Sequence, residues 1–588
     1  MPDRSTANPM APADLEAYLA RFAWHPEPEL IGYRDAGASR AELERLGAET
    51  WSAALDFLYG HAMDRAMGAP SGYEAARRSF YGADAGPSAA PAGPTPSAAI
   101  LDEFRTRLAG GQMNSQHPRQ FGYFTPPPLP ISIMGELLAQ MTNQGVDVWH
   151  AGPLAAFVEE EVVRWLCDLA GYGPESFGLL TSGGVMANFM AMTLARDIHL
   201  GRILEAGRPP RGSMLEGVRV YTSDQSHFSI ARSLDQLGFP PETLAIIPAD
   251  AAFHLRGEPV TAAIARDRAA GLTPFAIAAV AGSTNTGSVD AIGELADVAS
   301  AEDLWFHVDA AYGGAVRLST RDAGRVPALD RVDSITVDPH KWFFQAYDIG
   351  GLIVREGGHL ATVFGGRAPE YYRGGEDDHG ARTFLRQSPL GNTHHPREID
   401  DGGAHGGAYG AAAGAARGGA HGGAAGAADD DHGDQLNFYK LGFEGTRRWR
   451  ALKLWMSWKH LGTQGFGRLI EANDDLAAHL ARRCAAADDF EALPEVPELS
   501  VVCFRHLPGG RDAALALPPA ELDAHQDGLQ SALEISGDGW LTTTRLRGAT
   551  YLRAGIVNYL STEDDVDRLL ATLRSLADQS RPRAASRS

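Results

Sequence analysis

The chain has 588 residues, of which 44% are hydrophobic and 21% charged, and its formal net charge is -22 at pH 7. An acidic surface repels phosphate backbones and anionic headgroups, which disfavours nucleic acid and membranes as partners. Three scattered cysteines, Cys167, Cys484 and Cys503, supply neither a disulfide framework nor a zinc site. Because no apolar run reaches the roughly 18–20 residues of a membrane span and the N-terminus has no hydrophobic signal core, we expect a soluble, cytoplasmic globular protein without a metal centre.

The basic residues are almost all arginine. Of 52 lysines and arginines, only four are lysine: Lys341, Lys440, Lys453 and Lys459. Where arginine replaces lysine at sites that need only a positive charge, the remaining lysines are enriched for positions that need an amine. Lys341 is the strongest candidate, because it stands beside a histidine and a tryptophan just after a predicted buried strand.

Residues 1–125 predict an N-terminal helical segment. Ser39 is expected to cap an amphipathic helix over residues 41–67, and Ser97 a second helix that extends to residue 109. An Ala/Pro/Gly/Ser linker, residues 82–96, separates the two helices. The prolines within residues 119–131 exclude a helix interior there.

Residues 126–400 predict a large α/β domain. Short apolar runs alternate with helical patterns such as residues 186–200 and 292–300, which is typical of a mostly parallel sheet covered by helices on both faces. We expect a seven-stranded sheet. The predicted strands are residues 177–181, 218–222, 244–248, 275–281, 304–309, 334–337 and 351–354.

Residues 401–434 are a low-complexity insertion, and residues 435–580 predict a smaller C-terminal α+β domain. Of the 27 residues from 402 to 428, 23 are Ala or Gly, too few large apolar side chains to offset the entropy of ordering, so we expect disorder. The domain after it is expected to contain helices over residues 441–461 and 467–486 and strands over residues 499–505 and 550–557. Ser561 or Thr562 can cap a final helix.

Four motifs follow predicted strands, at the edge where open parallel sheets bind ligands. They are TSGGVMAN (181–188), SDQSHFS (223–229), WFHVDAAYGG (305–314) and DPHKW (338–342). The glycines of the first let an anion approach free N–H groups at a helix start. Asp309, ending a buried strand, needs a cationic partner, and partial desolvation makes the Lys341 amine nucleophilic. Each motif also has an ordinary explanation, as a turn, a helix cap or a buried ion pair.

Pyridoxal 5'-phosphate combines a phosphate group, a ring nitrogen that can donate a proton to an acceptor and a carbonyl that reacts with an amine. The motifs TSGGVMAN, SDQSHFSI, AGSTNTGSVD, HVDAAYGG and DPHKW, in this order, resemble the group II pyridoxal-phosphate decarboxylases, which include aromatic-L-amino-acid decarboxylase. The resemblance covers residues 110–395 and 435–575. It implies the fold type I (aspartate-aminotransferase-like) α/β architecture and a homodimer with shared active sites.

The resemblance also implies a role for individual residues. Lys341 would hold pyridoxal phosphate as a Schiff base, Asp309 would pair with the pyridine nitrogen, and His227 would stack on the ring. The other implied contacts are Gly184, Val185, Thr284 and His340 with the cofactor, Tyr123, Phe124 and Thr125 with the substrate, and Tyr371, or its neighbour Tyr372, as the loop acid that returns a proton to Cα. Val185 and Met186 stand where Ser–Glu is often found, so one phosphate contact is expected to be missing.

The implied activity is decarboxylation of an L-amino acid to an amine and CO2. An aromatic or bulky apolar side chain is favoured, because Tyr123, Phe124 and the prolines at 126–128 are apolar and no Arg or Lys cluster adjoins them. A branched-chain (valine-type) or acidic substrate, an aldehyde synthase, and an aminotransferase or carbon–carbon lyase on the same fold remain open. Arg553 on the last predicted strand could be misread as the carboxylate-binding arginine of an aminotransferase, but the HVDAAYGG and DPHKW motifs favour decarboxylation. A non-catalytic dimeric scaffold is the alternative from another functional class.

Overall fold

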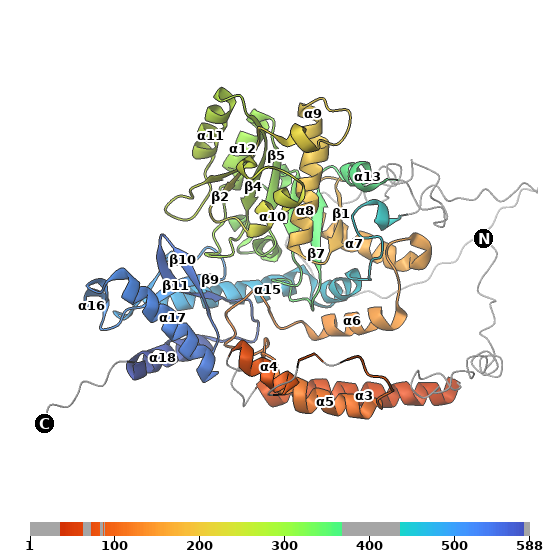
Figure 1. Ribbon diagram of the computed structural model, residues 1–588, viewed down its shortest axis with the longest axis vertical. Helices are drawn as coiled ribbons and strands as arrows, with labels where there is room; N and C mark the ends of the chain where they lie inside the picture. The colour runs from red at the N-terminus through yellow and green to blue at the C-terminus, as the bar shows by residue number, and fades with distance from the viewer. Residues whose placement is uncertain (1–35, 63–71, 83–85, 88, 367–435, 581–588) are drawn as a thin grey trace, which may run out of the picture.

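The computed structural model describes residues 36–62, 72–82, 86–87, 89–366 and 436–580 (Figure 1). Tyr371, Tyr372 and the low-complexity insertion at residues 401–434 lie outside the described residues. Within the described ranges, no helix is long and apolar enough to cross a membrane.

A seven-stranded, mostly parallel sheet forms the centre of the molecule, in the order β1-β7-β6-β5-β4-β2-β3. The strands are β1 (Phe177–Thr181), β2 (Val218–Ser223), β3 (Leu244–Ile247), β4 (Thr273–Val280), β5 (Trp305–Asp309), β6 (Ser334–Val337) and β7 (Gly350–Val354). All neighbouring pairs are parallel except those of β7, which runs antiparallel to both β1 and β6. The seven predicted strands are therefore confirmed.

Helices cover this sheet, so most of its strand residues are buried. Every residue of β1, β5, β6 and β7 is buried, as expected for strands enclosed on both faces. The covering helices are α7 (Pro153–Ala170), α8 (Gly184–Leu194), α10 (Phe228–Gln236), α11 (Gly257–Ala269) and α12 (Ile292–Glu302). Three of them, α8, α10 and α12, begin shortly after β1, β2 and β4, so their first turns lie near one edge of the sheet.

The smaller C-terminal domain contains an antiparallel four-stranded sheet in the order β10-β11-β9-β8. Its strands are β8 (Phe490–Ala492), β9 (Val501–His506), β10 (Thr542–Leu546) and β11 (Ala549–Gly555). Helices α17 (Pro519–Ser536) and α18 (Glu563–Ser580) pack on it around a separate apolar core that includes Phe504, Leu533 and Leu569. Thr562 is confirmed as the cap of α18: the N–H of Asp565 donates to Thr562 Oγ1, and the Asp565 carboxylate accepts from the Thr562 N–H at 3.0 Å.

The helix predicted over residues 441–461 begins ten residues later than expected. One long element, α15 (Ala451–Ala485), replaces the two predicted helices and crosses from the large to the small domain, interrupted at Gly462 by a positive φ of 63° (Figure 1). The preceding segment is not helical because the carbonyl of Arg447 accepts from the N–H of Val146 and Arg448 forms a bridge with Gly145. These tertiary bonds replace the intrahelical ones.

The N-terminal helices lie beside one another below α6 (Pro130–Thr142) in Figure 1. They are α3 (Ala36–Ala62), α4 (Tyr73–Tyr81) and α5 (Ser97–Glu103). Both predicted caps are wrong. Helix α3 begins at Ala36, which places Ser39 inside it, and Pro96 occupies the N-cap position of α5, so Ser97 is its first helical residue and makes no capping hydrogen bond.

Candidate active site

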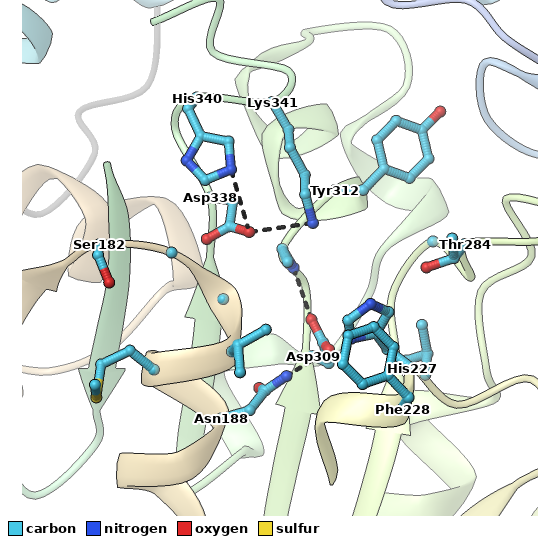
Figure 2. Close-up of a pocket in the computed structure, with 17 residues that line it drawn as sticks. Ser182, Asn188, His227, Phe228, Thr284, Asp309, Tyr312, Asp338, His340 and Lys341 are labelled. Carbon is cyan, nitrogen blue, oxygen red and sulfur yellow. Dashed lines mark hydrogen bonds and ion pairs between the residues drawn. The ribbon is translucent and has the colours of Figure 1, made fainter. Parts of the chain in front are cut away.

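A cavity of about 420 Å³ lies at the carboxyl ends of the parallel strands (Figure 2). Its walls come from the turn between β1 and α8, the start of α10, and the segments that follow β4, β5 and β6. Every residue predicted from the motifs to contact the cofactor lines this cavity: Gly184, Val185, His227, Thr284, Asp309, His340 and Lys341. Residues up to 157 positions apart in the sequence thus meet because parallel strands end at one edge.

Asp309 is a buried carboxylate at the end of β5, with 6% of its surface exposed. Its Oδ2 accepts a hydrogen bond from Asn188 Nδ2 at 2.7 Å, and its Oδ1 accepts one from the N–H of Ala311 at 3.1 Å. Neither donor carries a charge, so among the described residues that bond to it Asp309 has no cationic partner. The carboxylate is thus held in place with its negative charge available to a ligand in the cavity.

His227 is the N-cap residue of α10, and its ring lines the cavity. Its Nδ1 accepts from the N–H of Ser229 at 3.4 Å and lies 2.8 Å from Ser229 Oγ. Since Nδ1 accepts, the neutral ring carries its proton on Nε2. Burial lowers the pKa of His227, with the charge of Asp309 opposing that shift.

Asn188, which sequence reasoning assigned no role, connects these two side chains. Its Nδ2 donates both to Asp309 and to Ser229 Oγ at 2.8 Å, while its Oδ1 accepts from Thr336 Oγ1 at 2.6 Å and lies 2.9 Å from His307 Nε2. An asparagine in the buried, apolar first half of a helix was the signal for such a network, because buried amides are almost always hydrogen-bonded.

Lys341 extends into the cavity from the turn after β6. Its side chain is 24% exposed, and its Nζ lies 3.1 Å from Asp338 Oδ2. His340 lies 3.8 Å from the same oxygen, and burial lowers the pKa of its imidazole. The amine is therefore partly enclosed, paired with one carboxylate and accessible from the cavity (Figure 2).

The first turn of α8 offers backbone donors to the same space. Among the described residues, none accepts a hydrogen bond from the N–H groups of Gly184 and Val185, whereas those of Met186 and Ala187 donate to the carbonyl of Gly183. Free N–H groups at a helix start attract anions. The arrangement provides an anion site at one end of the cavity.

The predicted substrate residues lie outside the cavity wall of this chain. Tyr123 is 56% exposed, and Thr125 Oγ1 accepts from Gln120 Nε2 at 3.0 Å. Phe124 is buried and stacks on the cavity residue Tyr312, with ring centroids 4.1 Å apart. The structure therefore places Phe124 directly behind the wall.

Arg553 is also buried and does not line the cavity. Its Nε donates to the carbonyl of Thr284 at 2.7 Å and its Nη1 to that of Gly122 at 2.8 Å, while its guanidinium lies over the Phe124 ring. These bonds occupy two of its donors with backbone carbonyls. Arg553 thus joins β11 to the two loops beside the cavity.

Comparison with known proteins agrees with this geometry. The profile of the pyridoxal-dependent decarboxylase conserved domain matches residues 81–376 and 429–507. The chain is 28% identical to aromatic-L-amino-acid decarboxylase of Bacillus atrophaeus, covering 79% of this chain and 82% of that one, and 29% identical to L-2,4-diaminobutyrate decarboxylase of Rhizobium meliloti, covering 82% of each. The crystal structure of Oryza sativa TDC with PLP and tryptamine has the same fold, with a TM-score of 0.75 at 23% identity over 92% of this chain and 98% of that one.

The cavity suits pyridoxal phosphate. It combines a primary amine, free backbone donors for a phosphate and a buried carboxylate without a cationic partner for a protonated pyridine nitrogen, all on one edge of the sheet. No other cofactor is needed to explain this set of groups. The chain belongs to the pyridoxal-dependent decarboxylase family and is a pyridoxal-phosphate-dependent carboxy-lyase.

Proposed function

We propose that this enzyme decarboxylates an L-amino acid in the cavity at the carboxyl edge of the sheet, with Lys341 as the residue that binds the cofactor covalently. One observation carries the proposal: the Lys341 amine and the Asp309 carboxylate both line a single cavity of about 420 Å³, each held by a neighbouring side chain of the cavity wall, Asp338 and Asn188 respectively. Pyridoxal phosphate, when bound, supplies an electron sink for the pair released when the bond from Cα to the carboxylate breaks.

The other cavity residues have separate tasks in this proposal. Asp309, oriented by Asn188, keeps a proton on the pyridine nitrogen through a charge-assisted hydrogen bond. His227, with its proton on Nε2, covers the ring and helps to orient the substrate carboxylate. The N–H groups of Gly184 and Val185 bind the phosphate, and Thr284 and His340 complete the cofactor site.

We assign the return of a proton to Cα to Tyr371, with Tyr372 as the alternative. The segment PEYYR at residues 369–373 resembles the family's loop, and a phenol on a closing loop can deliver a proton while it excludes water. The Y371F variant should still release CO2 but form less amine, with oxygen consumed and aldehyde produced. Normal amine formation by Y371F together with its loss in Y372F would move the assignment by one residue.

The substrate in this proposal has an aromatic or bulky apolar side chain. Val280, Phe228 and Tyr312 contribute apolar surface to the cavity, whose described lining contains no arginine and no lysine besides Lys341. A second carboxylate on the substrate would therefore have no guanidinium to bind. L-2,4-Diaminobutyrate is the second candidate, because the Rhizobium meliloti relative named for that substrate is as similar to this chain as the aromatic-acid relative.

A screen of the purified protein tests both parts of the proposal. The protein loaded with pyridoxal phosphate should absorb visible light, and CO2 release should be measured with the protein amino acids and L-2,4-diaminobutyrate. Fastest release from an aromatic or bulky apolar acid supports the assignment. Fastest release from glutamate or valine, or amino transfer to a keto acid without CO2, would contradict it.

We further propose that the chain acts as a cytoplasmic homodimer with shared active sites. Large apolar side chains on α6 and α7 are exposed in the single chain, among them Met141 and Leu154, with 67% and 76% of their surfaces accessible. All three cysteines are buried thiols without a disulfide, as is usual in a reducing compartment. Light scattering of the purified protein should give twice the chain mass of 62.7 kDa.

A further inference from the structure

Asp338 is a buried carboxylate that the assigned roles leave unexplained. It follows β6, lines the cavity and has 2% of its surface exposed. Its Oδ2 is paired with Lys341, but its Oδ1 has no hydrogen-bond partner among the described residues. An unpartnered buried acceptor costs about 1–3 kcal/mol, so stability alone does not account for this side chain.

The carboxylate is wedged between two glycines. A Cβ on Gly184, at the start of α8, would lie 2.7 Å from Asp338 Oδ2, and a Cβ on Gly350 would lie 2.7 Å from Oδ1. No larger residue fits at either position without displacing the acid. Asp338 is therefore fixed between the Lys341 amine on one side and the first turn of α8, the proposed phosphate site, on the other (Figure 2).

Its ionised form creates two obstacles to cofactor attachment. In the ion pair, 3.1 Å from the Asp338 carboxylate, Lys341 is an ammonium ion, which has no lone pair to attack an aldehyde. The same negative charge, at the first turn of α8, repels a phosphate dianion. Transfer of one proton removes both obstacles at once.

We propose that Asp338 accepts the proton that Lys341 must lose before it condenses with the cofactor aldehyde. The ammonium and the carboxylate become an amine and a carboxylic acid. The amine nitrogen then forms a double bond to the aldehyde carbon, and the aldehyde oxygen leaves as water with the two remaining amine hydrogens. The neutral acid no longer repels the phosphate. This role rests on the proposed function of Lys341 and adds a proton acceptor to it.

The test follows cofactor uptake rather than turnover. Cofactor-free protein is mixed at neutral pH with either pyridoxal phosphate or pyridoxal, which lacks the phosphate, and the rise of visible absorbance is timed. The D338N variant should condense about 10²-fold more slowly with pyridoxal, and by a smaller factor with pyridoxal phosphate, because the charge that repels the phosphate is also gone. D303N, which removes an exposed carboxylate paired with Arg202 on the same domain, should match the wild type.

Two further measurements separate the proton transfer from a purely structural role. In D338A, which opens space beside Lys341, added formate should restore much of the lost rate, whereas D338N should not respond. Inorganic phosphate should raise the melting temperature of cofactor-free D338N more than that of the wild type, because the repelling charge is gone.

Wild-type rates of D338N with pyridoxal, or no response of D338A to formate, would overturn the proton transfer. Equal phosphate stabilisation of D338N and the wild type would overturn the charge effect on the phosphate. Failure of the underlying function gives a different result: the wild type would form no visible chromophore, or K341A would form one.

Discussion

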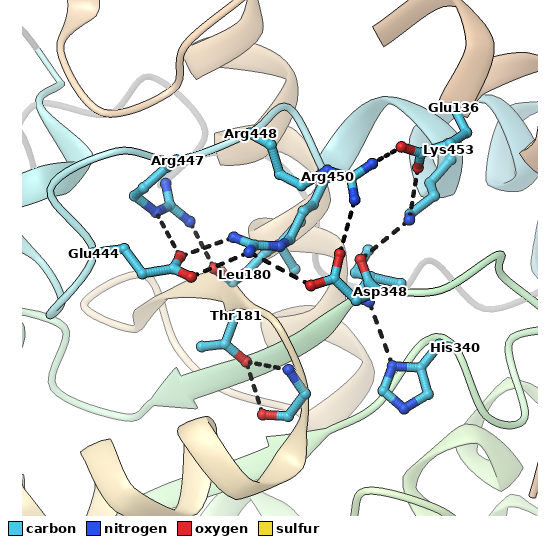
Figure 3. Close-up of polar contacts among 12 residues, drawn as sticks. Glu136, Leu180, Thr181, His340, Asp348, Glu444, Arg447, Arg448, Arg450 and Lys453 are labelled. Carbon is cyan, nitrogen blue, oxygen red and sulfur yellow. Dashed lines mark hydrogen bonds and ion pairs between the residues drawn. The ribbon is translucent and has the colours of Figure 1, made fainter. Parts of the chain in front are cut away.

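Two of the four lysines of this chain, Lys341 and Lys453, pair with carboxylates, and their surroundings differ in one decisive respect. Lys453, on α15, is 1% exposed, and its Nζ donates to Glu136 Oε2 at 2.8 Å and to the carbonyl of Asp348 at 3.1 Å (Figure 3). Arg448 pairs with the carboxylates of the same two residues. Lys341 has one carboxylate partner within the described part of the chain, and it borders a cavity.

A low pKa does not by itself make a lysine reactive. Burial lowers the pKa of Lys453 to about 7, a property expected of a nucleophilic amine. Yet its side chain is 1% exposed and its Nζ donates to two acceptors, so no carbonyl compound can reach it. We therefore expect that space beside the amine, rather than its pKa, separates a reactive lysine from a structural one.

The largest expected effect is on Lys341. K341A should lose the visible absorbance of the bound cofactor and essentially all turnover, and K341R should fail equally, because a guanidinium forms no Schiff base with the aldehyde. Absorbance spectra and CO2 assays measure both. K440A, which removes a half-buried lysine that does not line the cavity, should lose neither, and normal turnover by K341A would end the assignment of the cofactor site.

Substitution of Asp309 tests whether turnover requires a negative charge in the cavity as well as the Lys341 amine. D309N keeps the shape of the side chain but not the negative charge that holds a proton on the pyridine nitrogen, and it should reduce turnover about 10²-fold or more. Steady-state rates with the best substrate and a thermal melt measure the effect. The melting temperature should change little; a variant with wild-type turnover would remove Asp309 from the cofactor site.

Lys453 should show the opposite pattern. K453M leaves the partly buried carboxylate of Glu136 and carbonyl of Asp348 without their donor. It should reduce the free energy of unfolding by about 3 kcal/mol, the lower end for a broken buried pair, because the partners are only partly buried and Glu136 keeps Arg448. Urea denaturation measures the loss, and K459M, at an exposed lysine over the Trp455 ring, serves as the control. The visible absorbance of K453M should persist. Loss of that absorbance in a folded K453M protein would erase the distinction between the two lysines.

His307 lies behind the cavity, and we expect it to make the free energy of unfolding depend on pH, with a smaller effect than that of Lys453. Burial lowers its pKa to about 4, whereas a histidine in the unfolded chain titrates near 6.5. Between these values the unfolded state binds more protons, so stability should fall as the pH decreases, by about 2 kcal/mol from pH 6.5 to 5. Urea midpoints of H307N should fall less over this interval than those of the wild type, and the exposed H460N should follow the wild type.

The strands and the meeting of their motifs were predictable from the sequence. Near-continuous apolar runs such as residues 177–181 are buried on both faces in any parallel sheet, and parallel strands deliver the residues that follow them to a common edge. For that reason His227, Asp309 and Lys341 come together as the sequence predicts.

Contacts between distant segments were not predictable in this way. Helix α15 begins at Ala451 because the preceding residues bond to the segment around Val146, and no local pattern encodes that partner. Phe124 stacks behind Tyr312 instead of facing the cavity for the same reason.

The sequence by itself determined the succession of strands along the chain and the edge of the sheet at which their motifs meet, and it singled out Lys341, which lines the cavity there. Periodicity and short motifs are local properties, and the topology of parallel strands converts them into a site. Only the tertiary structure decided that Asn188 orients Asp309, that Lys453 is enclosed and that Asp338 lies between an amine and a helix start. Hydrogen-bond partners and free space depend on side chains brought together from distant positions, so they exist only once the chain has folded.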